Sequence, residues 1–109
     1  MLFRSTDYKA LGYEITVIIL AQVEGGHIAD VGAFAAKDPR VIQVYDITGD
    51  YDLCIIAKFK SIGELDSFVK QLNKLPYTKR TVTSLVLRVI KEDLSSPLLW
   101  EYNLKSTSV

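Results

Sequence analysis

The sequence places three carboxylates, Asp46, Asp50 and Asp52, around one short stretch that contains Gly49. Such a group could hold a cation or share acid–base work, although Asp50 is also a common turn residue. Calcium needs about six to eight oxygen ligands, and one short loop supplies too few. Backbone N–H groups, a carboxylate and the Tyr51 hydroxyl at one turn are better suited to holding a small zwitterion than to transforming it.

The remaining residues form no catalytic or metal-binding set. The single histidine, His27, has no companion at metal-ligand spacing and no serine or cysteine partner. The single cysteine, Cys54, has no basic neighbour in the sequence, so burial explains it better than catalysis, and it cannot form an internal disulfide. We therefore predict a protein that is not an enzyme, has no metal or cofactor, and stays in the reducing cytoplasm.

Charge and hydropathy argue against two classes of partner. Thirteen basic residues balance thirteen acidic ones, whereas a sequence-independent grip on nucleic acid needs clustered excess Lys and Arg. The short basic group Lys74, Lys79 and Arg80 is interpreted as a solvated loop. The apolar run 15–21 is far shorter than the roughly 20 residues that cross a bilayer. We expect one domain that contacts neither nucleic acid nor membrane directly.

A β-hairpin is predicted to position the acidic turn. The segment 41–60 has two β-rich runs on either side of Gly49 and Asp50, and glycine supplies the positive φ that a two-residue hairpin loop needs. Centring the turn there predicts the cross-strand pairs Thr48–Tyr51, Ile47–Asp52, Asp46–Leu53, Tyr45–Cys54, Val44–Ile55, Gln43–Ile56, Ile42–Ala57 and Val41–Lys58. One face of this hairpin is nearly all aliphatic, and the other is too apolar for a solvated face. We expect that second face to be a dimer interface, with these residues: Tyr45, Ile47, Cys54 and Ile56.

The other elements complete a common fold. Residues 14–23 are β-branched and apolar on both parities, which predicts a strand buried on both faces. Apolar residues at helical spacing predict a helix over 27–37, and a Ser-x-x-Glu capping box begins a second helix over 61–73. A last strand is expected over 78–91. The order βαββαβ predicts an α+β, ferredoxin-like domain, in which a four-stranded antiparallel sheet carries both helices on one face.

The two ends of the chain differ from this domain, which spans residues 14–93. Residues 1–13 are predicted to be a linker-like segment, in which Gly12 breaks any helix. Apolar residues alternate with other residues from Leu98 to Lys105. This period of two predicts an extra strand, or an arm laid on a partner, within residues 94–109, with disorder as the alternative.

Three stretches resemble the effector-binding domain of the Lrp/AsnC regulators, also called the RAM domain: TGDYDL at the turn, LGYEIT at the first strand and TSLVLRVIKED in the last strand. The resemblance covers residues 11–93. It implies a homodimer that forms sheet against sheet, assembly of dimers into higher oligomers, and amino-acid binding between dimers. The ligand-binding residues that it implicates are Gly49, Asp50, Tyr51, Asp52, Thr81, Thr83 and Ser84, with Glu24, Gly25 and Gly26 from a neighbour.

The chain departs from the full-length pattern of that family, whose regulators carry an N-terminal helix-turn-helix domain. Only residues 1–13 precede the first strand here. The resemblance therefore implies a stand-alone effector domain, or a truncated regulator, that senses an amino acid and acts by association, for example with full-length relatives. Three alternatives stay open: an ACT-like amino-acid-binding module, a small dimeric ferredoxin-like monooxygenase, and an assembly partner without ligand. The monooxygenase would need a substrate pocket between sheet and helices.

Overall fold

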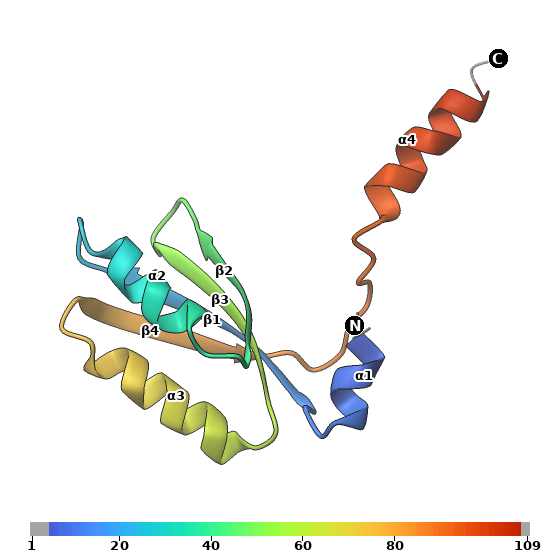
Figure 1. Ribbon diagram of the computed structural model, residues 1–109. Helices are drawn as coiled ribbons and strands as arrows, with labels where there is room; N and C mark the ends of the chain where they lie inside the picture. Colours follow the sequence, from blue (N-terminus) through green and yellow to red (C-terminus); the bar gives the residue numbers. More distant parts are fainter. Residues whose placement is uncertain (1–4, 108–109) are drawn as a thin grey trace.

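The sheet is a single antiparallel layer with the strand order β2-β3-β1-β4 (Figure 1). The computed structural model describes residues 5–107. Its elements are α1 (Ser5–Ala10), β1 (Ile15–Val23), α2 (Ile28–Ala36), β2 (Val41–Asp46), β3 (Leu53–Phe59), α3 (Ile62–Lys74), β4 (Thr78–Leu85) and α4 (Ser96–Thr107). The predicted βαββαβ order and ferredoxin-like α+β fold are confirmed from β1 to β4.

Helices α2 and α3 both cover one face of the sheet, and the hydrophobic core lies between them and that face (Figure 1). Strands β1 and β3 supply every second residue to this core, because side chains alternate between the faces of a strand. These residues are at most 4% exposed: Val17, Ile19, Ala21, Val23, Leu53, Ile55, Ala57 and Phe59. Phe68 of α3 packs on Phe59, with the ring centroids 5.6 Å apart. Burying a side chain such as Phe68 stabilises the fold by about 2 kcal/mol.

Helix α3 begins at the capping box that the sequence predicts. The Ser61 hydroxyl accepts the Glu64 N–H at 3.1 Å, which satisfies one of the unpaired donors of the first turn. The Glu64 carboxylate reaches one residue further back than expected and accepts the Lys60 N–H at 2.9 Å. An N-terminal cap contributes about 1 kcal/mol, so these bonds help to fix where β3 ends and α3 begins.

The β2–β3 hairpin has the predicted register close to its turn and another register at its far end. The confirmed pairs are Asp46–Leu53, Tyr45–Cys54, Val44–Ile55 and Gln43–Ile56. The predicted pairs of Ile42 with Ala57 and of Val41 with Lys58 are wrong. A β-bulge at Ile42 shifts the register and places Val41 opposite Ala57.

The turn of this hairpin is wider than the predicted two-residue loop. Thr48 and Tyr51 belong to the connection 47–52 rather than to paired strands. The Ile47 N–H still donates to the Asp52 carbonyl at 2.9 Å, but the Asp52 N–H donates to Ala21 of β1, also at 2.9 Å. Gly49 has a φ of +110°, as the turn prediction requires. The loop is therefore tied to β1 as well as to its own hairpin.

The other face of the sheet carries neither α2 nor α3. Opposed residues share a face, so the pairing defines an open face with these residues: Ile18, Leu20, Gln43, Tyr45, Cys54, Ile56, Val82 and Ser84. Tyr45 is 46% exposed and Ile18 is 36% exposed. Within one chain, β1 is therefore buried on the helix face, as expected, but its other face is partly exposed.

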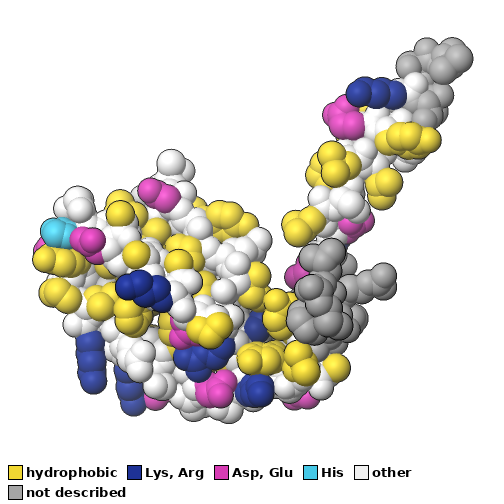
Figure 2. Space-filling view, in the orientation of Figure 1, with side chains coloured by type: hydrophobic (Ala, Val, Ile, Leu, Met, Phe, Trp, Pro, Cys, Tyr) yellow, Lys and Arg dark blue, Asp and Glu magenta, His cyan; other side chains and the backbone are white. Residues whose placement is uncertain are grey.

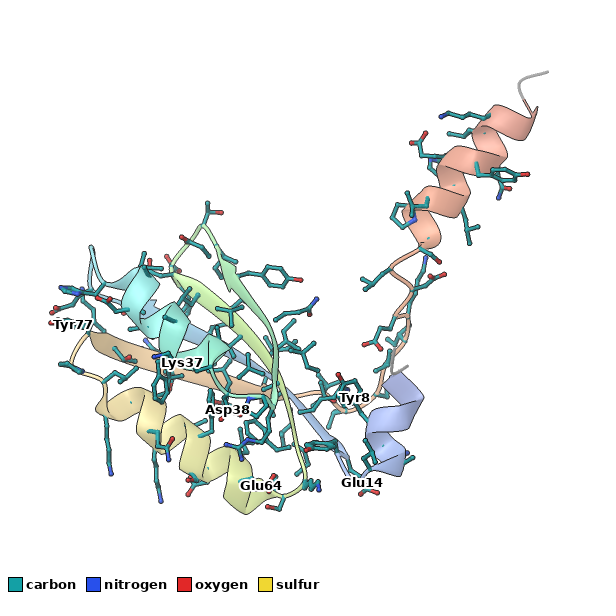
Figure 3. All side chains as sticks on the ribbon, in the orientation of Figure 1. Tyr8, Glu14, Lys37, Asp38, Glu64 and Tyr77 are labelled. Carbon is teal, nitrogen blue, oxygen red and sulfur yellow. The ribbon has the colours of Figure 1, made fainter. Side chains whose placement is uncertain are left out.

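A forked ion pair closes the connection between α2 and β2. The Asp38 carboxylate accepts hydrogen bonds from the Arg40 backbone N–H at 2.9 Å, from Nε at 3.0 Å and from Nη2 at 2.8 Å. The Arg40 guanidinium also lies over the Phe59 ring, 4.9 Å from its centroid. The hydrogen bond from the Arg40 side chain lowers the pKa of Asp38 and raises that of Arg40. Figure 3 marks Asp38 and, at the start of α3, Glu64, whose carboxylate lies 3.9 Å from Arg40 Nη1.

The prediction of an extra C-terminal strand is wrong, because residues Ser96–Thr107 form helix α4. Pro97 suits the first turn of a helix, and the segment contains neither Val nor Ile. A strand must pair its backbone with a neighbour, whereas a helix satisfies its own N–H groups. Strand β4 ends at Leu85, so the predicted strand 78–91 is too long, and residues 86–95 connect β4 to α4.

The predicted linker-like N-terminal segment contains the short helix α1, and the chain turns at Gly12, whose φ is +92°. Helix α1 lies against one end of the open face, where Lys58 Nζ is 5.5 Å from the centroid of the Tyr8 ring. The same nitrogen donates to Thr16 Oγ1 at 2.9 Å. Within residues 5–107, no helix has both the length and the apolar character that crossing a bilayer requires.

Candidate functional site

An open groove of about 570 Å³ lies where the loop 47–52 meets the end of β1 and the start of β4. Its lining is mostly polar: Gln22, Val23, Gly49, Asp50, Tyr51, Asp52, Lys79 and Arg80. The four predicted residues of the turn are thus brought together, and four residues from β1 and β4 join them. We call this site the loop groove.

The Asp52 carboxylate holds the loop against β1. Its Oδ2 accepts the Val23 N–H at 2.8 Å, just beyond the last residue pair between β1 and β3. If β3 began earlier, a carbonyl of its backbone would accept the Val23 N–H. The Asp52 carboxylate accepts it instead. The Gln22 side chain adds a second tie, since its Nε2 donates to the Asp50 carbonyl at 3.2 Å. These contacts position both the backbone and the carboxylates of the turn.

A β-bulge in β4 turns two basic side chains toward this groove. Gln22 is opposite Arg80 and Val23 is opposite Thr78, so Lys79 is the extra residue. Both Lys79 and Arg80 are exposed, and neither takes part in an ion pair within the described part of the chain. The loop groove therefore combines two carboxylates with two cations that a bound molecule can still reach.

Lys79 and Arg80 are exposed, as expected, but they belong to β4 rather than to a loop. Their position beside the turn was not predicted, because charge was judged along the chain rather than across the sheet. The signal was in the strand order: β1 lies between β3 and β4 in a ferredoxin-like sheet, so the start of β4 runs beside the turn before β3. Gln22 follows from the same argument, because it is one residue from the end of β1.

The predicted residues of β4 lie outside the loop groove of a single chain. Thr81 is opposite Ala21 on the helix face, and its hydroxyl donates to the Asn73 side chain at 3.1 Å. Thr83 is opposite Ile19 on the same face. Ser84 belongs to the open face.

The turn Glu24–Gly26 also lies outside this groove. It is closed by a hydrogen bond of 3.1 Å from the His27 N–H to the Glu24 carbonyl, and Gly26 has a φ of +88°. Gly26 lines a second, smaller groove of about 480 Å³ between α2 and β2. The His27 ring stacks on Tyr77 at 3.4 Å, which anchors the turn to the chain before β4 (Tyr77 is labelled in Figure 3).

The four residues predicted for a dimer interface divide into two groups. Tyr45, Cys54 and Ile56 lie together on the open face, where Tyr45 is opposite Cys54. Ile47 is the first residue after β2 and belongs to the loop that borders the groove. The predicted interface and the loop groove are therefore neighbours, joined by the turn itself.

Comparison with known proteins gives one consistent family. A model described as the Lrp/AsnC ligand binding domain matches residues 16–95. An uncharacterised HTH-type transcriptional regulator of Pyrococcus abyssi is 40% identical, with 80% of this chain and 59% of the relative covered. The chain spans about three-fifths of the length of the curated relatives it matches.

Solved structures show the same fold. The protein TTHA0845 from Thermus thermophilus matches with a TM-score of 0.67 and 34% identity, over 72% of this chain and 99% of that one. A Neisseria meningitidis transcriptional regulator, solved as a complex with L-Met, matches with a TM-score of 0.76 and 22% identity, over 90% of this chain and 64% of that one.

Proposed function

Because this chain belongs to the family of Lrp/AsnC ligand-binding domains, we propose that it senses an amino acid and regulates transcription through changes in its assembly. The regulatory role follows from the family, whose curated relatives are HTH-type transcriptional regulators. The amino-acid ligand, the assembly response and the absence of enzymatic activity are our proposals. The balanced charge of the chain argues against direct contact with DNA. A cytoplasmic location and a partner protein, such as a full-length relative, are further parts of the proposal.

The charge pattern of the loop groove carries this proposal. A free amino acid presents an ammonium group and a carboxylate a few bonds apart. The Asp50 and Asp52 carboxylates suit the ammonium group, and Lys79 and Arg80 suit the carboxylate, because charge-assisted hydrogen bonds are the strongest that side chains offer. Among the described residues only one oxygen of Asp52 accepts a hydrogen bond, from Val23. Its second oxygen can therefore receive the ligand.

The open face supplies the second half of the proposal. We assign Tyr45, Cys54 and Ile56 to a sheet-against-sheet dimer contact, with Ile47 at its border. The loop groove is open in one chain, and a second dimer beside it would close it. The turn residues Glu24, Gly25 and Gly26 would then come from that neighbour. Thr81, Thr83 and Ser84 would contribute from β4 of the chain that holds the groove. The L-Met complex of the Neisseria meningitidis regulator supports an amino acid as the ligand class.

A thermal-shift screen of the twenty amino acids tests the proposal. Ligand at about 100 times its dissociation constant stabilises the folded state by roughly 2.7 kcal/mol, which raises Tm by roughly 10 °C in a domain of this size. The matched controls are the N-acetyl and amide derivatives of any amino acid that responds, because each lacks one of the two charges. The proposal predicts that both derivatives lose the response. An absence of response to all twenty amino acids at 10 mM (about 100 times a 100 μM dissociation constant) would contradict it.

A further inference from the structure

The C-terminal extension is defined here as residues 86–95 together with α4. The start of the connection lies beside β1, and α4 projects away from the rest of the chain (Figure 1). Its large apolar side chains are open to solvent: Leu98 is 73% exposed, Trp100 63% and Tyr102 69%. Figure 2 shows hydrophobic side chains at several levels of the projecting helix, with a few charged ones beside them. A helix of this character needs cover that its own domain does not give.

Two properties of α4 indicate that it would be unstable as an isolated helix in water. Isolated helices shorter than roughly 12 to 15 residues are marginal in water, and α4 has 12 residues. Its apolar residues are also distributed around the axis, since Leu98 and Tyr102 share one side while Leu99 and Trp100 point elsewhere. A helix that is apolar on several sides is normally buried on several sides.

The extension lies at the boundary of the family domain. The match to the family ends at residue 95, one residue before α4 begins. The Thermus thermophilus structure covers 72% of this chain and 99% of its own, so a shorter chain forms the same fold. The sheet from residue 16 onward and its two covering helices lie within the family match, and α4 lies outside it.

Apolar surface continues from the open face into the extension. Val82 of β4 is opposite Leu20, and Val86 follows in the same direction, with its N–H bonded to the Thr16 carbonyl at 2.8 Å. Beyond Val86 the connection exposes more large apolar side chains: Leu87 at 95%, Ile90 at 88% and Leu94 at 88%. Large apolar side chains therefore recur along the chain from the open face to α4.

We propose that the C-terminal extension packs on a second copy of this chain and lengthens the contact made by the open faces. This inference rests on the sheet-against-sheet dimer of the proposed function. A two-fold axis relates the same patch on both copies, so each extension leaves its own sheet along the shared surface and reaches the other copy. There the partner's domain and the partner's extension cover α4 from different sides.

The charge of the extension favours this occupant over other classes. Arg88, Lys91 and Lys105 are balanced by Glu92, Asp93 and Glu101. Binding to nucleic acid or to an anionic membrane depends on excess positive charge, which this segment lacks. An interfacial membrane helix also needs one strongly charged face, whereas the charged residues of α4 are only Glu101 and Lys105 among its described side chains.

Trp100 provides a direct test, because it is the single tryptophan of the chain. Its emission and its quenching by acrylamide are measured across a dilution series, with the oligomeric state followed by analytical ultracentrifugation. The proposal predicts blue-shifted, protected emission in the assembled protein, and red-shifted, quenchable emission after dissociation. Emission that stays exposed in the assembled protein would overturn the inference, as would a chain that is monomeric at all concentrations.

Two variants test the energetic contribution of the extension. A chain ending at Ser95 lacks α4, and the pair Leu98→Ala with Tyr102→Ala keeps the helix and the tryptophan. Each change is expected to raise the dimer dissociation constant by about tenfold or more, because large buried apolar side chains are lost. Ile62→Ala is the matched control, since Ile62 is 56% exposed on α3, and it should leave the constant unchanged. Circular dichroism checks that each variant is folded. If the shortened chain is unfolded, the double variant alone tests the contribution of the extension.

The same samples separate this inference from the proposed function. If an amino acid still stabilises the protein but Trp100 stays exposed, only the extension contact is refuted. The same holds if both variants dimerise like the wild type. Protected Trp100 with no amino-acid response refutes the ligand proposal and leaves the extension contact standing.

Discussion

The Asp52 carboxylate and the Val23 backbone N–H are joined by a hydrogen bond of 2.8 Å, although 29 residues separate them in the chain. This bond attaches the hairpin loop to the end of β1 and forms one wall of the loop groove. One side chain therefore serves both the fold of the loop and the charge of the candidate site. Substitutions of Asp52 can separate these two roles, because an amide keeps the acceptor oxygen and removes the charge.

Asp52→Asn is expected to leave the free protein folded and assembled, since the amide oxygen can still accept the Val23 N–H. It should strongly weaken stabilisation by an amino acid, because the ammonium group loses the charge of Asp52 and keeps only that of Asp50. Thermal shift with and without ligand measures both effects. Asp52→Ala is the comparison, and it should lower the free energy of unfolding by about 1–3 kcal/mol through the lost hydrogen bond. A normal ligand response in Asp52→Asn would remove this residue from the site.

Arg80→Gln should weaken amino-acid binding without changing the free energy of unfolding. Arg80 is exposed, lines the loop groove, and makes no ion pair within the described residues. Loss of a charged hydrogen bond of about 1.5–3 kcal/mol corresponds to roughly a ten- to hundredfold rise in the dissociation constant. Isothermal titration calorimetry measures this change. Lys74→Gln, an exposed change at the end of α3, is the control, and equal losses in both variants would point to a general charge effect.

The ion pair of Asp38 and Arg40 predicts a specific loss of stability in acid. Its hydrogen bond lowers the pKa of Asp38 from 3.8, so the contribution is fully present above that unfolded-state value. It is lost as the pH falls through the lower folded-state value. Chemical denaturation between pH 7 and pH 2 should show a smaller acid-dependent loss in Asp38→Asn, which also costs about 1 kcal/mol at neutral pH.

Asp66→Asn is the matched control for this pH dependence. Asp66 pairs with Lys70 at 2.9 Å, but its side chain is 59% exposed and that of Lys70 is 70% exposed. Exposed pairs contribute little to stability, so this variant should follow the wild-type curve. An acid profile of Asp38→Asn that equals the wild-type profile would show that the forked pair does not control this loss.

Cys54 should report assembly through the open face. It is the single cysteine of the chain, it lies opposite Tyr45 and Leu20, and it is half-buried in one chain. The rate of its reaction with a thiol reagent should fall as protein concentration rises through the dimer dissociation constant. Tyr45→Lys places a charge in the proposed contact and should keep the thiol reactive at high concentration. Reactivity independent of concentration in an assembled protein would place the contact elsewhere.

Patterns with a local physical cause were predictable from the sequence. The register near the hairpin turn follows from Gly49 and from alternation of the strands, and the start of α3 follows from the Ser61 and Glu64 pair. The bulge at Ile42 was not predictable in this way, because one inserted residue leaves the alternation on either side intact. Pairing of the sheet, rather than local pattern, decides where such an extra residue lies.

The loop groove and α4 show two further limits. Lys79 and Arg80 join the turn only through the β1–β4 register, which no local pattern contains. The alternating residues from Leu98 to Lys105 satisfy a strand period, but without a neighbouring strand their backbone finds its hydrogen bonds within a helix. The period of two described only the order of the side chains. The structure was decided by the lack of a neighbouring strand with which the backbone could pair.

The two bulges also affect how this molecule can polymerise. Strand β2 is irregular at Ile42 and β4 at Lys79, and these strands form the two edges of the sheet. A regular exposed edge is a template for strand addition by further chains, and bulges and lysines are common natural protections against it. A protein that associates through the face of its sheet while both edges resist addition forms particles of finite size. Fibril growth along the edges is thereby disfavoured even at concentrations where the faces are fully associated.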